Sequence, residues 1–165
     1  MRETNRIVIN TGPIIALIAA SGDLEILRQL YDQVLVPNEV AQEVLAGGDL
    51  GFGISQFTEA SWLCRQSTDL VISPFLQNIL DRGEASVIQL ALSENIGMVC
   101  IDETLGRRAA RLNGLQLTGS VGILLRAKLE GHLVSVKTAL ERMRMHGIWL
   151  SEKVMHVALR EAGEL

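Results

Sequence analysis

The chain has 165 residues, of which 48% are apolar and 21% are charged, and its 15 basic and 19 acidic side chains give a net charge of −4. A chain of this length and composition buries a proper core, which excludes a disordered protein. The negative balance excludes a protein that binds nucleic acid by charge over its whole surface, so any such contact requires a local patch.

Prolines and glycines divide the chain into short elements. Pro13, Pro37 and Pro74 each follow a short apolar run and precede a helix-like segment. Proline is tolerated in the first turn of a helix, because the backbone N–H that it lacks would have no hydrogen-bond partner there. In the first third of the chain the pattern predicts a strand at 6–10, helices at 13–20 and 24–30, a strand at 34–36, a helix at 37–46 and a glycine-rich loop at 47–53. A less regular stretch follows, with a helix and a short strand near Trp62. The rest of the chain is predicted to form helices at 74–80 and 84–95, a strand at 98–102, a helix at 104–113, a strand at 115–118, and helices at 121–130, 136–146 and 151–162.

Short, fully apolar strands that alternate with helices are typical of a parallel sheet covered by helices on both faces. We therefore expect an α/β fold that forms a single domain over residues 1–165. The helices from about 136 to 165 are expected to be an appended part of the same domain. In such folds ligands bind at the carboxyl ends of the strands, which directs attention to the residues found there.

Two predicted strands end in oxygen-bearing side chains. Asn10 follows the first strand, and Asp102 ends the strand in the middle of the chain. Core packing does not explain a carboxylate at this position. A helix N-cap is an equally good explanation for a single acid, and Asp102 or Thr104 could cap the helix that follows.

Two helices add glutamates at informative places. In the helix at 37–46, Glu39 and Glu43 are four residues apart and share a face next to the inward-facing valines. Glu84 begins a helix whose apolar stripe includes Ile88, one turn later, so Glu84 is expected to point toward the sheet. Taken alone, Glu84 is explained as well by the helix dipole, which favours acids in the first turn. Taken together, four oxygen-bearing side chains are predicted to converge at one end of the sheet.

Several acids in one crevice repel each other unless cations neutralise them. Mg²⁺ or Mn²⁺, with carboxylate and water ligands, is the natural cation for such a site. Two such ions about 4 Å apart would activate water and stabilise the leaving oxygen in phosphodiester cleavage. The residues therefore suggest this chemistry, although their spacing alone does not establish it.

Five segments in the expected order carry a resemblance that covers nearly the whole chain. They resemble a PIN domain, in an uncharacterised bacterial and archaeal branch near the VapC toxins. The segments are 7–15 (IVINTGPII), 36–44 (VPNEVAQEV), 80–85 (LDRGEA), 99–103 (VCIDE) and, for the late motif of that branch, 118–128 (TGSVGILLRAK).

The resemblance implies a three-layer α/β/α domain and a Mg²⁺- or Mn²⁺-dependent ribonuclease that is often dimeric. It places the acidic quartet of the family, which is both the catalytic and the metal-binding set, on Asn10, Glu43, Glu84 and Asp102. The family usually has aspartate where this chain has Asn10. Asparagine still offers an oxygen ligand, but a neutral one, so the site loses one of four charges.

Substrate contacts are expected next to this quartet. Arg107, Arg108 and Arg111 could hold the RNA backbone, although a solvated helix face explains the arginines equally well. Ser120 begins a helix after a strand, where a phosphate can bind, but an ordinary N-cap is the more common use of such a residue. Thr11, beside Asn10, completes the predicted substrate-binding set.

The leading hypothesis is a metal-dependent endoribonuclease that acts as the toxin of a toxin–antitoxin pair, with RNA as substrate and an antitoxin protein as partner. The alternative is a catalytically weakened PIN fold that binds RNA or protein. A phosphatase of similar fold is least favoured, because Asn10 cannot be its aspartate nucleophile. The low charged fraction suggests a homodimer. Cys64 and Cys100 form no disulfide framework, and no run reaches the roughly 18 apolar residues of a membrane helix, so we expect a cytoplasmic protein with no membrane contact.

Overall fold

The computed structural model describes residues 5–47 and 52–165, so most of the predicted loop at 47–53 lies outside the described residues. Its elements, in chain order, are β1 (Arg6–Ile9), α1 (Thr11–Ser21), α2 (Glu25–Leu30), β2 (Gln33–Val36), α3 (Asn38–Leu45), α4 (Ile54–Glu59), β3 (Cys64–Arg65), α5 (Pro74–Ile79), α6 (Arg82–Ser93), β4 (Met98–Cys100), α7 (Thr104–Leu112), β5 (Gln116–Thr118), α8 (Ser120–Leu129), α9 (Val136–Met145) and α10 (Glu152–Glu161).

The five strands form one parallel sheet in the order β3-β2-β1-β4-β5. In this sheet Val8 pairs with Leu35 of β2 on one side and with Val99 of β4 on the other. The chain moves outward from β1 to β2 and β3, then returns to the other side of β1 to form β4 and β5. The gap between the ends of β1 and β4 is therefore the switch point of the sheet, where such folds bind ligands.

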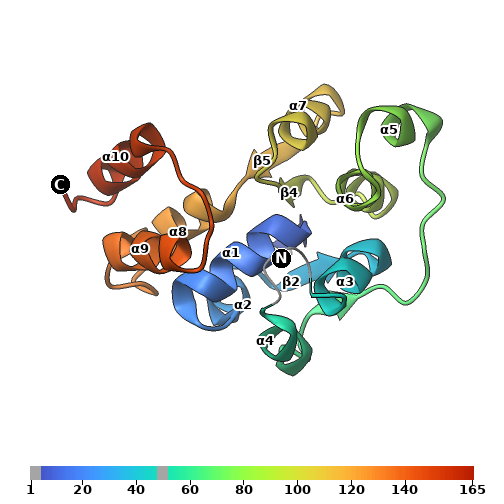
Figure 1. Cartoon of the computed structure of the whole chain (residues 1–165). Coiled ribbons are helices and arrows are strands. Elements are labelled where there is room, and N and C mark those ends of the chain that lie inside the picture. The colour runs from blue at the N-terminus through green and yellow to red at the C-terminus, as the bar shows by residue number, and fades with distance from the viewer. Residues whose placement is uncertain (1–4, 48–51) are drawn as a thin grey trace.

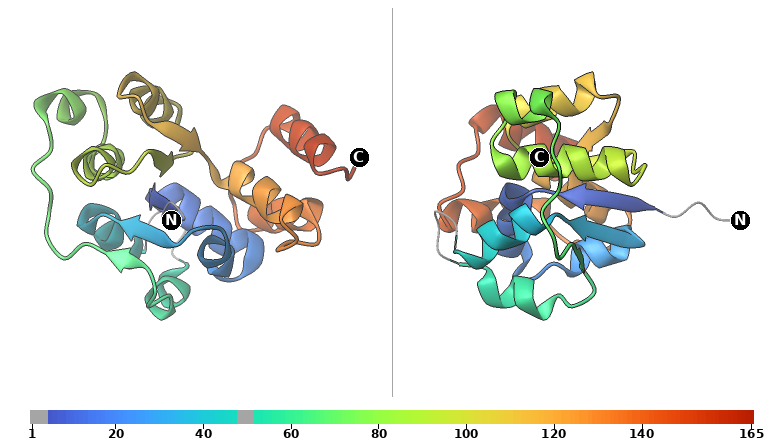
Figure 2. Two further views of the ribbon diagram at one scale, coloured as in Figure 1. Left: turned by 180° about the vertical axis from the view of Figure 1, so that it is seen from behind. Right: turned by 90° about the vertical axis from the view of Figure 1, so that its right-hand side faces the viewer.

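Helices cover both faces of the sheet, as the ribbon views show (Figures 1 and 2). On one face α1 packs against α8 and α9, and on the other α6 packs against α5 and α7. Helix α3 contacts both α1 and α6. Because the sheet is covered twice, its central strands are apolar on both sides, and Ile7, Val8 and Ile9 are fully buried. The predicted three-layer α/β/α fold is confirmed.

The predicted elements agree with the observed ones to within a few residues at each end. Helix α6 begins two residues earlier than predicted, at Arg82, because the Asp81 side chain accepts a hydrogen bond from the Glu84 N–H (2.8 Å) and caps the helix. The apolar run at 70–72 forms no strand, and Val71 is almost fully exposed. None of the helices within the described ranges is both long enough and apolar enough to cross a membrane.

The end of the chain is fixed to α9 by one carboxylate. Glu164 accepts hydrogen bonds from the N–H groups of Val136 (2.7 Å) and Lys137 (3.1 Å) and from the Ser135 hydroxyl (3.0 Å), and it pairs with Lys128 (3.3 Å). Burial opposes ionisation of this carboxyl, but the hydrogen bonds outweigh it and lower the pKa of Glu164 to about 2.

We expect Glu164→Gln to destabilise the protein by about 1 kcal/mol at pH 7, because a neutral amide is a weaker cap for the start of α9. The folded-state pKa lies below the ordinary value of 4.5. The stabilisation from Glu164 is therefore complete above about pH 4.5 and is lost as the pH falls toward 2. Urea unfolding of both forms across this range tests the expectation, with Glu161→Gln, at the exposed end of α10, as the matched control. Equal stability of wild type and Glu164→Gln at pH 7 would contradict it.

Candidate metal and nucleic-acid site

The carboxyl edge of the sheet carries three of the predicted site residues. Asn10 directly follows β1, Asp102 comes two residues after β4, and Ser120 begins α8 shortly after β5. The backbone N–H of Asn10 donates to the carbonyl oxygen of Cys100 (3.1 Å), which ties the ends of β1 and β4 together. These residues therefore lie at the switch point, where the fold itself creates a binding crevice.

The side chain of Asn10 is buried, with only 6% of the residue exposed, yet it makes no hydrogen bond to any residue within 5–47 or 52–165. Asn10 occupies the N-cap position of α1, but its side chain does not cap that helix. Buried polar groups normally have partners, and the exceptions are found where a ligand, ion or water binds. The Asn10 amide thus has the surroundings of a ligand-binding group.

Three side-chain oxygens surround the space beside Gly83, in the first turn of α6. A Cβ on Gly83 would lie 2.8 Å from Glu43 Oε2, 3.5 Å from Asn10 Oδ1 and 3.6 Å from Asp81 Oδ1. Because Gly83 has no side chain, the Glu43 carboxylate can approach the start of α6, where the helix dipole favours negative charge. The turn therefore brings side chains from three separate elements to one place.

The Glu43 side chain is exposed, but a hydrogen bond from the start of α1 fixes its orientation. The hydroxyl of Thr11, at the start of α1, donates to Glu43 Oε2 (3.0 Å). Thr11 was predicted to bind substrate. In this structure its hydroxyl holds the Glu43 carboxylate close to Asn10.

Glu84 is buried in the first turn of α6, with 6% of its surface exposed, and its Oε1 would lie 3.5 Å from a Cβ on Gly106 of α7. Burial is the main cause that raises the pKa of Glu84, and the negative charges of Asp81, Glu103 and Glu43 add to it, while the Asp81 backbone N–H acts in the opposite direction. The resulting pKa is about 7. A buried carboxylate that ionises only near neutral pH would gain strongly from a nearby cation.

Asp102 belongs to a second cluster at the same edge. Its two oxygens accept hydrogen bonds from the Ser120 N–H (2.8 Å) and the Ser120 hydroxyl (2.9 Å). Arg107 Nη1 donates to the carbonyl oxygen of Ile101 (2.8 Å). A Cβ on Gly119 would lie 2.6 Å from Asp102 Oδ1 and 2.9 Å from Arg107 Nη1, so both groups occupy space that only glycine leaves open.

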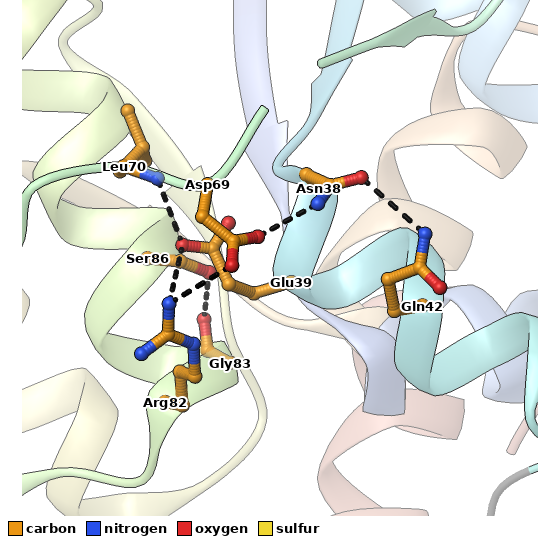
Figure 3. A network of polar contacts seen from close by, with 8 residues as sticks. All are labelled: Asn38, Glu39, Gln42, Asp69, Leu70, Arg82, Gly83 and Ser86. Atoms are coloured by element: carbon orange, nitrogen blue, oxygen red, sulfur yellow. Dashed lines mark hydrogen bonds and ion pairs between the residues drawn. The ribbon is translucent and has the colours of Figure 1, made fainter. Parts of the chain in front are cut away.

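A network of polar contacts links α3 to α6 (Figure 3). The Glu39 side chain is 2% exposed, and its Oε2 accepts a hydrogen bond from the Leu70 N–H (3.1 Å) and lies 4.0 Å from Arg82 Nη2. Arg82 also pairs with Asp69 (3.1 Å), which accepts a hydrogen bond from the Asn38 side chain (2.7 Å). Glu39 and Glu43 were predicted to share a neighbouring face of their helix, and Glu43 is the one whose carboxylate lies beside Gly83 and Asn10.

The predicted quartet is thus found at one edge but not in one cluster. Asn10 and Glu43 are close together, and the charge of Glu43 affects the buried Glu84, whereas Asp102 is bound to Ser120. Within the described part of the chain, no three Asp, Glu, His or Cys side chains form a group that could hold a metal ion. The shared role of the quartet in metal binding stays a prediction.

The residues nevertheless fit a hard divalent cation in two respects. The Asn10 amide oxygen makes no hydrogen bond to another described residue, and Gly83 leaves a space that carboxylate and amide oxygens face. Oxygen ligands of this kind, completed by water, are those that Mg²⁺ and Mn²⁺ prefer.

The predicted substrate-binding residues differ in how far they are free to contact RNA. Ser120 is buried and both of its donors are directed at Asp102, while Arg107 is half-buried and bonded to the backbone. Arg108 and Arg111 are exposed on α7. Contact of any of these residues with RNA stays a prediction.

Sequence reasoning missed two residues of the site. Asp81 and Gly83 were treated only as the opening of a helix. The available signal was an N-cap aspartate three residues before a glutamate, which marks a helix start at the ligand-binding edge of a parallel sheet. No sequence signal shows that Gly83 faces Asn10, because the two are 73 positions apart.

Fold and site together define a parallel α/β domain with acidic side chains gathered at the switch point of its sheet. The chain belongs to the PIN domain family, since a family model described as PIN domain matches residues 6–164. PIN domains are generally nucleases that use divalent metal ions. Neither the curated proteins nor the solved structures compared with the chain gave a match. The predicted membership of this family is confirmed.

Proposed function

We propose that the protein is a Mg²⁺- or Mn²⁺-dependent endoribonuclease. The observation that carries this proposal is the pair of buried polar side chains, Asn10 and Glu84, beside Glu43 at the switch point of a PIN-domain sheet. Core packing gives no reason to place an amide that hydrogen-bonds to no described residue, and a carboxyl group of raised pKa, at the one edge where the fold binds ligands.

In this proposal Asn10, Glu43, Glu84 and Asp102 hold the metal ions. A bound ion activates water and stabilises the leaving oxygen of a phosphodiester. The remaining work falls to the chain's own groups. Thr11 fixes the Glu43 carboxylate, and the Ser120 N–H and hydroxyl fix Asp102.

The Arg107 guanidinium lies close to Asp102 and is the best placed of the three arginines to contact a phosphate there. Exposed Arg108 and Arg111 extend positive charge along α7, which supports binding of an RNA backbone. This is the local basic patch that the acidic overall charge requires.

A toxin role, with an antitoxin protein as partner and a homodimer as the assembly, belongs to the same proposal. Apolar side chains that remain exposed, including Phe75 and Ile79 on α5 and Trp149 before α10, support a further contact surface. A cytoplasmic location is consistent with these partners and is proposed with them.

Cleavage of single-stranded RNA should require a divalent ion. We expect purified protein to cut a fluorescently labelled RNA in Mn²⁺, to stop in excess EDTA, and to recover when Mn²⁺ is restored, because the acidic side chains alone cannot activate water. An RNase-free preparation carrying Asp102→Asn serves as the control for a contaminating nuclease. Cleavage that continues in excess chelator would rule out the proposed reaction.

One observation favours a second function, an RNA- or protein-binding module that has lost most of its activity. Asn10 is neutral, and the described residues contain no group of three potential ligands of the acidic, His or Cys type. RNA binding that is equally tight with EDTA and with Mn²⁺, without cleavage at any Mn²⁺ concentration, would favour this alternative.

A further inference from the structure

We propose that Asp81 is an additional metal-binding residue of this site, and that its carboxylate supplies the negative charge that Asn10 lacks. The proposal rests on the metal-dependent function proposed above. It adds a residue of α6 to a set otherwise drawn from Asn10, Glu43, Glu84 and Asp102.

The first argument is position. Asp81 Oδ1 and Asn10 Oδ1 are nearly equidistant from the position of a Cβ on Gly83, at 3.6 and 3.5 Å, and Glu43 Oε2 lies 2.8 Å from the same point. Apart from Gly83 itself, its two chain neighbours and the backbone of α6, these three are the nearest atoms to that point. An acid at position 81 therefore places charge in the same small space that an acid at position 10 would occupy.

The second argument comes from the buried Asn10 amide. It is 6% exposed and has no hydrogen-bond partner among residues 5–47 and 52–165, and its oxygen is directed at the space beside Gly83. Because no described residue hydrogen-bonds to Asn10 Oδ1, this oxygen is available to a ligand in that space. A cation there would be shared between the amide and the two carboxylates, and water would complete its coordination.

The third argument is that capping alone does not require a charge at position 81. Asp81 Oδ1 accepts the Glu84 N–H (2.8 Å), a contact that asparagine or serine would make about as well. The cap therefore does not explain a charged carboxylate at position 81, and Asp81 Oδ1 faces the same space beside Gly83 as Asn10 Oδ1 and Glu43 Oε2.

Two other acids could have replaced the missing charge, and the structure argues against both. Glu39 directs its Oε2 to the Leu70 N–H and Arg82, and none of its atoms is among those nearest to the space beside Gly83. Glu103 is exposed at the start of α7, and none of its atoms is among the nearest to the space beside Gly83.

The test removes the charge and keeps the cap. Asp81→Asn and Asp81→Ser both preserve an acceptor for the Glu84 N–H, and thermal melts verify that each variant folds. Mn²⁺ binding, measured by calorimetry and by the loss of the free Mn²⁺ signal in electron paramagnetic resonance, should weaken by roughly tenfold in both. Asp23→Asn is the matched control, since Asp23 accepts the Glu25 N–H (3.1 Å) at the start of α2, remote from the site.

The decisive variant combines Asp81→Asn with Asn10→Asp. Because positions 10 and 81 face the same space, this exchange should restore Mn²⁺ binding to within about threefold of wild type, whereas Asp81→Asn with Glu103→Gln should restore nothing. If wild type binds Mn²⁺ and Asp81→Asn binds it equally tightly, the role of Asp81 is refuted while the metal-dependent function stands. If wild type itself binds no Mn²⁺, the proposed function fails first.

Discussion

Glu84→Gln is expected to lower the rate of RNA cleavage at least a hundredfold and, in the same protein, to raise the stability of the metal-free form by about 2 kcal/mol at pH 8. The two effects have one cause. Glu84 is buried near Asp81, Glu103 and Glu43, and its pKa is raised to about 7, so its charge is costly until a cation arrives. Glutamine has almost the same shape without that cost.

The direction of the expected change in stability follows from the pH at which Glu84 ionises. A carboxyl whose folded-state pKa is about 7 instead of 4.5 favours the folded state fully below about pH 4.5, and this contribution is lost as the pH rises through 7. In EDTA, wild type should therefore lose stability between pH 5 and 8, while Glu84→Gln should lose much less. Added Mn²⁺ should stabilise wild type at pH 8 and have little effect on the variant.

Urea unfolding at several pH values, with and without Mn²⁺, measures the stability, and the labelled RNA measures the rate. Glu59→Gln makes the same change at the exposed end of α4 and should alter neither quantity. If Glu84→Gln is less stable than wild type in EDTA at pH 8, ionisation of the Glu84 carboxyl does not destabilise the folded protein. Full cleavage activity in that variant would remove Glu84 from the reaction.

The fold could be predicted because its signals are local. Ile7, Val8 and Ile9 form a fully apolar run that suits only a strand covered on both faces, and Pro74 begins α5 as expected of a proline in a first helical turn. The short strand expected near Trp62 is found as β3 (Cys64–Arg65), which pairs with β2.

The site was harder to predict because its contacts are not local. Parallel topology correctly placed Asn10 and Asp102 at one edge, but the pattern could not show that Ser120, 18 positions later, would take both oxygens of Asp102. Likewise, helical spacing alone could not show that Glu39 turns to Leu70 while Glu43 turns to Thr11. These pairings depend on how α3, α6 and α8 meet after the chain has folded.

Asn10→Asp is expected to tighten Mn²⁺ binding by roughly tenfold and to lower the Mn²⁺ concentration needed for cleavage. The reason is the charge balance of the site. Within the predicted quartet, Glu43, Glu84 and Asp102 supply three formal charges, and an aspartate at position 10 would add one more beside Glu43 and the proposed ligand Asp81. In the metal-free protein that charge would be buried and repelled, which should cost on the order of 2 kcal/mol of stability at pH 8.

The opposite signs of these effects separate a metal ligand from a structural residue. Calorimetric titration with Mn²⁺, urea unfolding in EDTA and the RNA assay should be run on wild type, Asn10→Asp and Asn78→Asp, which adds the same charge on the exposed face of α5. Only Asn10→Asp should bind Mn²⁺ more tightly while being less stable without it. If Asp81 supplies the missing charge, the gain from Asn10→Asp should be larger in the Asp81→Asn background than in wild type, because the second acid in a shared space adds less than the first. Equal Mn²⁺ affinity and equal cleavage rates in wild type and Asn10→Asp would mean that Asn10 binds no metal, and that the buried amide beside Gly83 serves another ligand.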